Sequence, residues 1–451
     1  MNTSSLQPVT RAAFALALVG LLAATVAGCD SLLKKDPPDE ISNEQAITDA
    51  GGAEAALTGA YNALQSSAYY GGGQLFLLDV TTENTMHVGT YTSYANADQQ
   101  RFETSNAVIS DLFGALYDGI NRTNNIIERV PQVEMDEAER ARIVGEAHFL
   151  RALMYHDLVR LWGGVPVRLE ATASADLGPV ERDSRSAVYE QITSDLSMAA
   201  DRLSAGGPSQ AKRASLGAVR ALEARVALYR ENWSAAASAA DAVLGMDYTL
   251  ASDFGAIFDG EGTSEDLFKV DFNAQSINDL AYYYFPSSLG GRGELAPDTD
   301  LIDAFPAGDE RGAWSIDSTG DGTPYGAKYR RTDGSEDVHV LRLAEMLLIK
   351  AEAHARQGEL DAAVTAYNRL RTRAGLPEHT LGDDVSGQSE VLDAVWREWR
   401  LEMAFEGARW PNLVRTGRAT DVLGLEDYKT RFPIPQREVE LTDMEQNPGY
   451  N

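Results

Sequence analysis

Cysteine is almost missing from this chain, and the shortage limits its possible folds and functions. Cys29 is the only cysteine among 451 residues, so no disulfide can form within the chain and stability must come from a hydrophobic core. The six histidines are scattered and lack the spacing of zinc ligands. Motifs of zinc proteases, phosphate-binding loops and serine hydrolases are also absent. We therefore expect no metal and no cofactor, and several common classes of enzyme are disfavoured.

Lysine is scarce as well, in a chain that is strongly acidic. The sequence has 68 Asp and Glu against 39 Lys and Arg, a formal net charge of −29, and only 7 of the basic residues are Lys. This charge repels phosphate groups, so nucleic acids and anionic lipid surfaces are poor partners. Two explanations of the composition remain open. One is adaptation to strong brine, in which salt screens the repulsion, and the other is a GC-rich genome that favours Arg codons.

The position of the single cysteine indicates its role. Arg11 is the only charged residue before it, and residues 12–28 form an apolar run of Ala, Leu, Val and Gly. This pattern is typical of a secretory signal rather than of a membrane span. The junction Val-Ala-Gly-Cys at 26–29 resembles the lipobox of bacterial lipoproteins, which implies cleavage before Cys29 and lipid attachment to its sulfur. The alternative is an ordinary signal cut nearby, which would leave Cys29 as a free thiol.

The clearest local pattern is a pair of helices joined by a tight turn. In LRLAEMLLIKAEAHARQGELDAAVTAYNRLRTRAGLP (341–377), Gly358 ends one amphipathic helix, and Ala363 and Tyr367 lie on the returning face of the next. Small residues with an aromatic four positions on resemble a tetratricopeptide hairpin, in which two helices pack closely. Residues 221–244 repeat the arrangement.

Two further helix pairs are predicted from hydrophobic periodicity. One pair joins 138–162 with 186–204, and the other joins 46–66 with 106–130. A final helix is expected at about 390–408. The predicted fold is therefore mostly α: a tetratricopeptide-like scaffold of about four helical hairpins, with a large irregular, loop-rich insertion packed on one face.

Two insertions interrupt this scaffold. Residues 246–336 are rich in Gly, Asp, Pro and aromatics, with 13 aromatic residues between 246 and 330, about 15% against 8% for the chain. A disordered linker would be poor in aromatics, so this segment is expected to fold onto the helices. A smaller insertion, 67–105, divides the first hairpin. Because insertions in repeat proteins gather on the binding face, we expect ligand binding where the two meet.

Six stretches, in order along the chain, resemble the SusD/RagB family of outer-membrane nutrient-binding lipoproteins. They are CDSLLKKDPPDEIS (29–42), ALTGAYNAL (56–64), GEAHFLRALMYHDLVRLWGGVPV (145–167), RLAEMLLIKAEAHARQGELDAAVTAYNRLRTRAGLP (342–377), WREWRLEMAFEGARWPNLVRTG (396–417) and RFPIPQREVELTDMEQNPGY (431–450). Two positions depart from the family pattern. Trp399 stands where Arg is usual, and Pro411 stands where an aromatic is commoner.

The resemblance implies a non-catalytic protein anchored at the outer surface of the outer membrane. Members of the family close over an oligosaccharide, or sometimes a peptide, as a lid on a SusC-like TonB-dependent transporter. A glycan-processing enzyme is the rival class. The division that we expect is a signal peptide at 1–28, a lipid-anchored tether at 29–42, an N-terminal helical region at 43–245 with the 67–105 insertion, the aromatic insertion at 246–336 and a C-terminal region at 337–451.

Aromatic and amide side chains in the two insertions are the candidate ligand contacts. A sugar ring has an apolar face of C–H groups that stacks on a Tyr or Trp ring, while polar side chains bind its hydroxyls. The candidates are Tyr69, Tyr70, Asn84, Tyr91, Tyr94, Asn96, Tyr282, Tyr283, Tyr284 and Trp314. Three consecutive tyrosines cannot all point into the core, so at least one of residues 282–284 should face outward.

Two charged patterns have more than one interpretation. DSTGDG at 317–322 faintly resembles a calcium loop, but Thr319 replaces a carboxylate and Lys328 stands where a closing Glu is required. The second pattern is a ladder on the predicted final helix, formed by Glu398, Arg400, Glu402, Glu406 and Arg409. The ladder is either acid–base machinery or a set of ion pairs in i,i+4 geometry that braces the helix. We favour the ion pairs.

Overall fold

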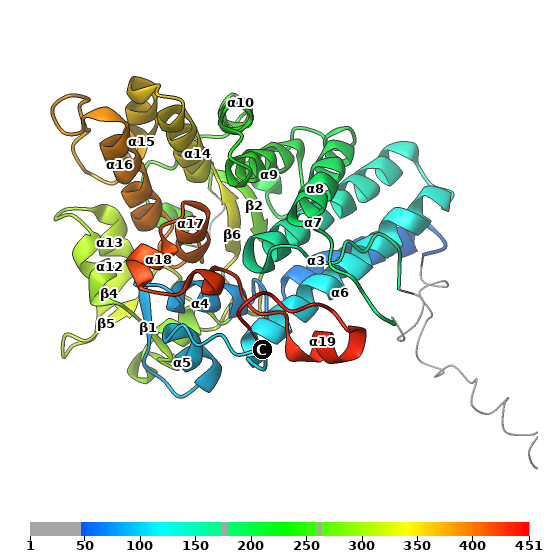
Figure 1. Ribbon diagram of the computed structural model, residues 1–451. Helices are drawn as coiled ribbons and strands as arrows, with labels where there is room; N and C mark the ends of the chain where they lie inside the picture. The colour runs from blue at the N-terminus through cyan, green and yellow to red at the C-terminus, as the bar shows by residue number, and fades with distance from the viewer. Residues whose placement is uncertain (1–46, 173–177, 260–262, 451) are drawn as a thin grey trace, which may run out of the picture.

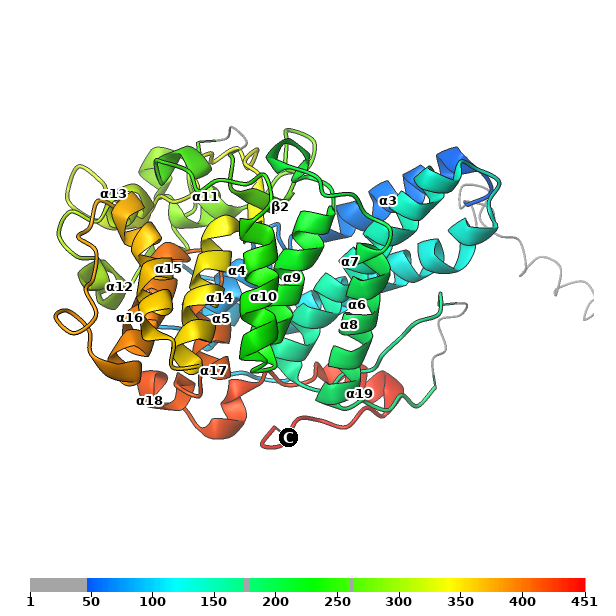
Figure 2. The same cartoon turned by 90° about the horizontal axis from the view of Figure 1, so that it is seen from above.

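The computed structural model describes residues 47–172, 178–259 and 263–450. Cys29, the signal segment and the tether lie outside the described residues. All four predicted hairpins are present. They are α3 (Ala50–Leu64) with α6 (Ala107–Arg129), α7 (Glu137–Trp162) with α8 (Arg185–Ala200), α9 (Leu216–Tyr229) with α10 (Trp233–Leu244), and α14 (Leu343–Arg356) with α15 (Leu360–Arg373). Figure 2 shows them side by side in one row, which confirms the predicted scaffold.

Local sequence explains where these helices begin and turn. The side chains of Asn106 and Asp136 accept hydrogen bonds from the first backbone N–H groups of α6 and α7, which are otherwise unsatisfied. Gly358, between α14 and α15, has a φ of +80°, which glycine adopts without steric cost. Helix α7 is buried along most of its length, so it forms the centre of the scaffold.

The two insertions contain short elements packed on the helices. The first holds α4 (Gly73–Val80), β1 (Thr85–His87) and α5 (Thr92–Asp98). The second holds β2 (Asp266–Val270), α11 (Leu280–Tyr284), β3 (Leu295–Pro297), α12 (Thr299–Ala304), α13 (Glu310–Ser315), β4 (Ile316–Ser318) and β5 (Pro324–Gly326). Strand β6 (Val338–Arg342) follows and leads directly into α14.

The described residues form three antiparallel strand pairs, and two of them fasten the insertions in place. β2 pairs with β6 and so ties the second insertion to the fourth hairpin. β4 pairs with β5 in a local hairpin. β1 pairs with β3, with Thr85 opposite Pro297 and His87 opposite Leu295. This last pair joins the two insertions, which confirms that they meet.

The prediction of one final helix over 390–408 is wrong. Helix α16 (Gly387–Glu402) ends earlier, and α17 (Arg409–Arg415) begins after a turn. Within the turn Phe405 and Gly407 have φ values of +62° and +67°, which no helix accommodates. Pro411 lies in the first turn of α17, where its missing N–H removes no helical hydrogen bond. Helices α18 (Ala419–Leu423) and α19 (Gln436–Thr442) complete the chain.

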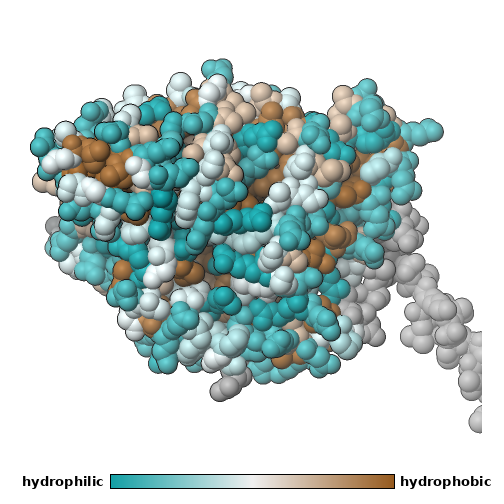
Figure 3. Space-filling model, turned by 45° about the horizontal axis from the view of Figure 1, so that its top comes forward, coloured by the Kyte–Doolittle hydropathy of each residue, from teal (hydrophilic) through white to brown (hydrophobic). Residues whose placement is uncertain are grey.

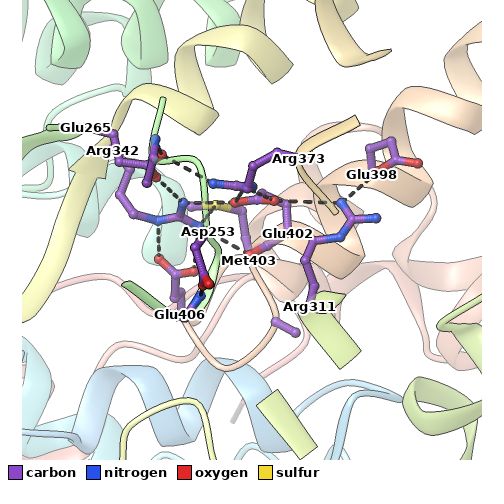
Figure 4. A network of polar contacts seen from close by, with 12 residues as sticks. Asp253, Glu265, Arg311, Arg342, Arg373, Glu398, Glu402, Met403 and Glu406 are labelled. Atoms are coloured by element: carbon purple, nitrogen blue, oxygen red, sulfur yellow. Dashed lines mark hydrogen bonds and ion pairs between the residues drawn. The ribbon is translucent and has the colours of Figure 1, made fainter. Parts of the chain in front are cut away.

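The three glutamates of the charged ladder belong to a buried ion-pair network, shown in Figure 4. Its two arginines, Arg400 and Arg409, pair with Glu83. Glu402 accepts hydrogen bonds from Arg373 at 2.6 Å and from Arg342 at 2.9 Å. Glu398 binds Arg311 at 2.7 Å and Arg371 at 2.8 Å. The prediction of ion pairs is confirmed, but the i,i+4 geometry is wrong, because the partners come from distant segments. The ladder therefore fastens α16 to the rest of the molecule.

The charges of this network determine the protonation state of its carboxylates. Burial alone would raise the pKa of Glu402, but the neighbouring Arg373, Arg342 and Arg311 outweigh it and hold the pKa well below its ordinary value. Glu406 behaves in the same way beside Arg342 and Lys328. These carboxylates are therefore ionised and fully engaged, which is the behaviour of structural ion pairs rather than of proton donors.

The surface in Figure 3 is mostly hydrophilic, with apolar residues gathered in small separate patches. Among the helices of the described ranges, none is long and apolar enough to span a bilayer.

Candidate functional site

Aromatic rings gather where the two insertions meet. Phe76 of α4 stacks on Tyr283 of α11 with 4.7 Å between ring centroids, and Tyr94 of α5 meets Tyr283 edge-on at 6.2 Å. Tyr91 contacts Tyr94 at 5.1 Å, and Tyr282 contacts Tyr283 at 6.1 Å. We call the rings of the two insertions that contact one another here the aromatic platform. Its members are Phe76, Tyr91, Tyr94, Tyr282, Tyr283 and Tyr284.

The platform has an outer and an inner layer. Tyr91 is 37% exposed and Tyr282 is 38% exposed, and Tyr283 is half-buried. Phe76, Tyr94 and Tyr284 are buried beneath them. The expectation that at least one of residues 282–284 faces outward is confirmed. The buried layer holds the outer rings in position, so the exposed surface of the platform is preorganised.

The two insertions also expose apolar side chains outside the platform. Val88, Ile277 and Leu289 are each about half exposed. They belong to the same two insertions as Tyr91 and Tyr282, so these insertions carry five of the nine most exposed large hydrophobic residues in the described part of the chain. Clustered apolar exposure marks interaction surfaces in soluble proteins.

A buried carboxylate organises the platform from behind. Glu294 accepts a hydrogen bond from Arg292 at 2.7 Å, contacts His87 at 2.9 Å and accepts another from the backbone N–H of Tyr91. Burial would raise the pKa of Glu294, but these donors, Arg292 foremost, lower it. The Arg292 guanidinium lies 5.4 Å from the ring centre of Tyr283. Glu294 thus fixes Tyr91, and through Arg292 it stabilises Tyr283.

The predicted site residues fall into distinct groups. Tyr91, Tyr282 and Tyr283 present surface to solvent, and Tyr94 and Tyr284 support them from inside. These five come together in the platform.

The other candidates do not join the platform. Tyr69 is fully buried and donates a hydrogen bond to Asp157. Tyr70 is buried and lines a small cavity of about 50 Å³. Asn84 is buried and accepts a hydrogen bond from Arg400 at 2.7 Å. In this conformation these three offer no surface to an external ligand.

Two candidates remain at the periphery. Asn96 of α5 is half-buried and accepts a hydrogen bond from Arg101 at 2.9 Å. Trp314 of α13 lies beneath Arg330, whose guanidinium is 4.0 Å from the ring centre. Within the described ranges no aromatic contact joins Trp314 to the platform.

Sequence reasoning missed Phe76, His87, Arg292 and Glu294. The available signal was the charged pair inside GGRGE (290–294), which follows the aromatic run by a few residues. Binding residues lie disproportionately on loops that a rigid scaffold positions.

The loop that faintly resembles a calcium site is a hairpin turn. Asp317 accepts a hydrogen bond from Tyr325 at 3.1 Å. Lys328, at the position of the closing ligand, instead donates to the carbonyl groups of Glu402 and Ala404. In the described portion of the chain, no group of three or more His, Cys, Asp or Glu side chains is arranged to hold a metal ion.

The fold and the site together define a class: a helical-repeat protein that presents a preformed aromatic surface. The chain belongs to the SusD/RagB family. Residues 314–431 match the model described as "SusD family", and residues 33–228 match the model described as "Starch-binding associating with outer membrane".

Relatives and solved structures agree with this assignment. The chain is 27% identical to SusD-like protein P2 of Formosa agariphila, over 95% of this chain and 98% of that protein. It is 32% identical to the starch-binding protein SusD of Bacteroides thetaiotaomicron, over 42% of this chain and 33% of that protein. A SusD superfamily protein from Bacteroides vulgatus has the same fold, with a TM-score of 0.81, 21% identity and coverage of 89% of this chain and 99% of that one. A laminarin-binding SusD-like protein has a TM-score of 0.79, 24% identity and coverage of 89% and 100%.

Proposed function

We propose that this protein is a non-catalytic lipoprotein of the outer-membrane surface that captures a carbohydrate on the aromatic platform. It delivers the carbohydrate to a SusC-like TonB-dependent transporter. The observation that carries the proposal is the pair of exposed rings, Tyr91 and Tyr282, held in place by a buried layer. Sugar rings stack on such surfaces, and two similar proteins are named for binding starch and laminarin.

The carboxylate behind the platform, Glu294, supports binding rather than catalysis. Glycoside cleavage needs one carboxylic acid that can donate a proton and a second carboxylate about 5–10 Å away. Glu294 is buried, ionised and engaged by three donors, so it is not available as an acid. The proposed division of the chain follows from this role: residues 1–28 direct export, 29–42 tether the protein, and the insertions 67–105 and 246–336 carry the site on the scaffold.

Changing Tyr282 to alanine is expected to weaken carbohydrate binding at least about fivefold, because a stacking ring at a binding centre contributes more than roughly 1 kcal/mol. Retardation in gels that contain laminarin or starch measures the effect. Tyr428→Ala is the matched control, since Tyr428 packs only on Tyr450 near the C-terminus among the described rings. Equal binding by wild type and Tyr282→Ala, or equal loss in both variants, would contradict the proposal. If the protein binds peptides but is retarded by neither polysaccharide, its ligand is a peptide.

Changing Cys29 to alanine is expected to give a protein that is exported but no longer partitions into membranes, since acyl chains supply the attachment. Fractionation of cells, with a high-salt wash of the membranes, measures this. A variant that stays with the washed membranes would show that the lipid anchor is not at Cys29.

A transporter partner should be recoverable with the protein. Mild detergent extraction of the tagged, full-length protein is expected to yield a complex with a large TonB-dependent barrel. If the barrel is present in the same membranes while the tagged protein migrates alone, the delivery role is wrong.

A further inference from the structure

A hollow of ligand size lies away from the aromatic platform. It has a volume of about 730 Å³ and lies between α3, α7 and the segment 202–215 that joins α8 to α9. We call it the α3–α7 hollow. Its volume falls within the range of about 300–1,000 Å³ that small-molecule sites occupy.

Four charged side chains in the wall of this hollow form a closed set of ion pairs. Arg142 binds Glu54 and Glu146, each at 2.6 Å. Arg213 binds Glu146 at 2.7 Å and Glu54 at 3.0 Å. Two cations therefore face two anions. Lys212, on the rim, is paired in the same way with Asp271 and Asp337. A charged ligand gains little from these paired groups, whereas a hydroxyl group, which both donates and accepts, can use either partner.

The paired groups are rigidly held but still accessible. Glu146 is 1% exposed and also accepts a hydrogen bond from Tyr61 at 2.6 Å. The Arg213 guanidinium lies 4.8 Å from the ring centre of Tyr61. The side chains of Arg142 and Arg213 nevertheless remain 39% and 37% exposed. Their orientation is fixed before a ligand arrives, which reduces the entropy cost of binding.

Unengaged polar side chains complete the wall. Ser204, Ser209 and Gln210 line the hollow and are exposed. Within the described residues, no hydrogen bond to another part of the protein engages the side chains of these three residues. Arg202, also in the wall, uses its guanidinium to donate to the backbone carbonyl of Met198 and has no carboxylate partner there. These groups supply free donors and acceptors beside the fixed ion pairs.

Hydrogen bonds to the second insertion link the segments near the hollow with those near the platform. The N–H of Lys269 donates to Ala211 at 2.9 Å, and the Gln65 side chain donates to the carbonyl of Asp271 at 2.6 Å. Asp279, directly before α11, donates from its N–H to Gly71 at 2.9 Å. Seen from above, α11, β2 and α3 follow one another along one edge of the molecule (Figure 2).

We propose that the α3–α7 hollow is a second carbohydrate subsite, which binds the hydroxyl groups of a neutral glycan chain that also lies on the aromatic platform. The inference rests on the proposed function and deepens it, because it names the ligand class as neutral and long. A chain held at two places gains affinity without new contacts at either one. The net charge of −29 acts against acidic glycans.

We would test the second subsite and the neutral ligand class by gel retardation. The panel contains neutral polysaccharides (laminarin, starch, xylan) and acidic ones (alginate, dextran sulfate). Gln210→Ala and the double variant Arg202→Ala/Gln210→Ala are compared with wild type, with Tyr282→Ala and with Arg369→Ala, an exposed control on α15. Circular dichroism verifies that each variant is folded. We expect the double variant to lose at least about threefold in affinity for the neutral polysaccharide that the wild type binds, and Gln210→Ala to lose part of this, while Arg369→Ala loses nothing.

The outcomes separate the two proposals. If the hollow variants bind neutral polysaccharide as the wild type does while Tyr282→Ala is impaired, the second subsite is wrong and the platform stands. Preferred binding of an acidic polysaccharide by the wild type overturns the neutral ligand class. A wild type that binds nothing on the panel overturns both proposals.

Discussion

Replacing Glu402 with alanine is expected to lower the free energy of unfolding by about 3–5 kcal/mol, the usual cost of breaking a buried ion pair from one side. The reason is the buried positive charge that would lose its partner. Arg342 and Arg373 are almost completely buried and both bind this carboxylate. Without it, two guanidinium groups remain in the interior with fewer anions than cations around them. The variant should unfold at a temperature many degrees lower.

Asp393→Ala is the matched control, because Asp393 lies on the same helix and is exposed. Its replacement should leave thermal and urea unfolding almost unchanged. If Glu402→Ala unfolds like this control, the network does not hold α16 in place and its description as structural is wrong.

The second large effect is a pH dependence that arises at Asp79. This side chain is 1% exposed and accepts hydrogen bonds from the N–H of Gly407 at 3.2 Å and from the hydroxyl of Tyr284 at 3.3 Å. Burial raises its pKa to about 7, although these two donors and the charge of Lys328 oppose the shift; the nearby Glu406 carboxylate adds to it. In the unfolded chain an Asp has a pKa near 3.9.

The direction of the pH dependence of stability follows from proton binding at Asp79. Between about pH 4 and pH 7 the folded protein holds a proton at Asp79 that the unfolded chain has released, so stability falls as the pH rises through this window. From pH 5 to pH 8 the loss from this one group is roughly 2–3 kcal/mol. Above pH 8 the effect is complete.

Asp79→Asn removes the titration while keeping an oxygen that accepts from Gly407. Urea unfolding at pH 5 and pH 8 is expected to show the variant gaining roughly 2–3 kcal/mol relative to wild type between these two values. Taking the difference between the two proteins cancels the other titrating groups. A difference that is the same at both pH values would show that Asp79 titrates normally.

The hairpins could be predicted because their signals are local. A helix of this scaffold needs an apolar stripe, a cap and a small residue at the turn, and all three lie within about 35 consecutive residues around Gly358. The break after Glu402 could not be predicted in this way. Residues 396–408 retain helical periodicity, but Asp79 accepts the hydrogen bond of Gly407, and this long-range contact lies outside any local pattern.

The site shows the same division between local and long-range information. Composition was sufficient to single out the two insertions, and the strand pair β1–β3 shows that they meet. That this face binds the ligand stays a prediction. Which rings face out was not encoded locally. Tyr282 and Tyr284 differ only by their positions on the single turn of α11, and the inward one is fixed by Asp79 and Phe405. Glu294 was missed because its role depends on Tyr91, some 200 residues earlier in the chain.

A crystal structure of the mature protein with a bound oligosaccharide, chosen from the glycan that retards it most strongly, tests the central claim most directly. The account predicts a sugar ring stacked on Tyr91 or Tyr282, with carbon atoms within about 4–4.5 Å of the aromatic ring. It also predicts an intact glycosidic bond. A glycan bound elsewhere with both rings still exposed to solvent, or a cleaved product in the site, would contradict the account.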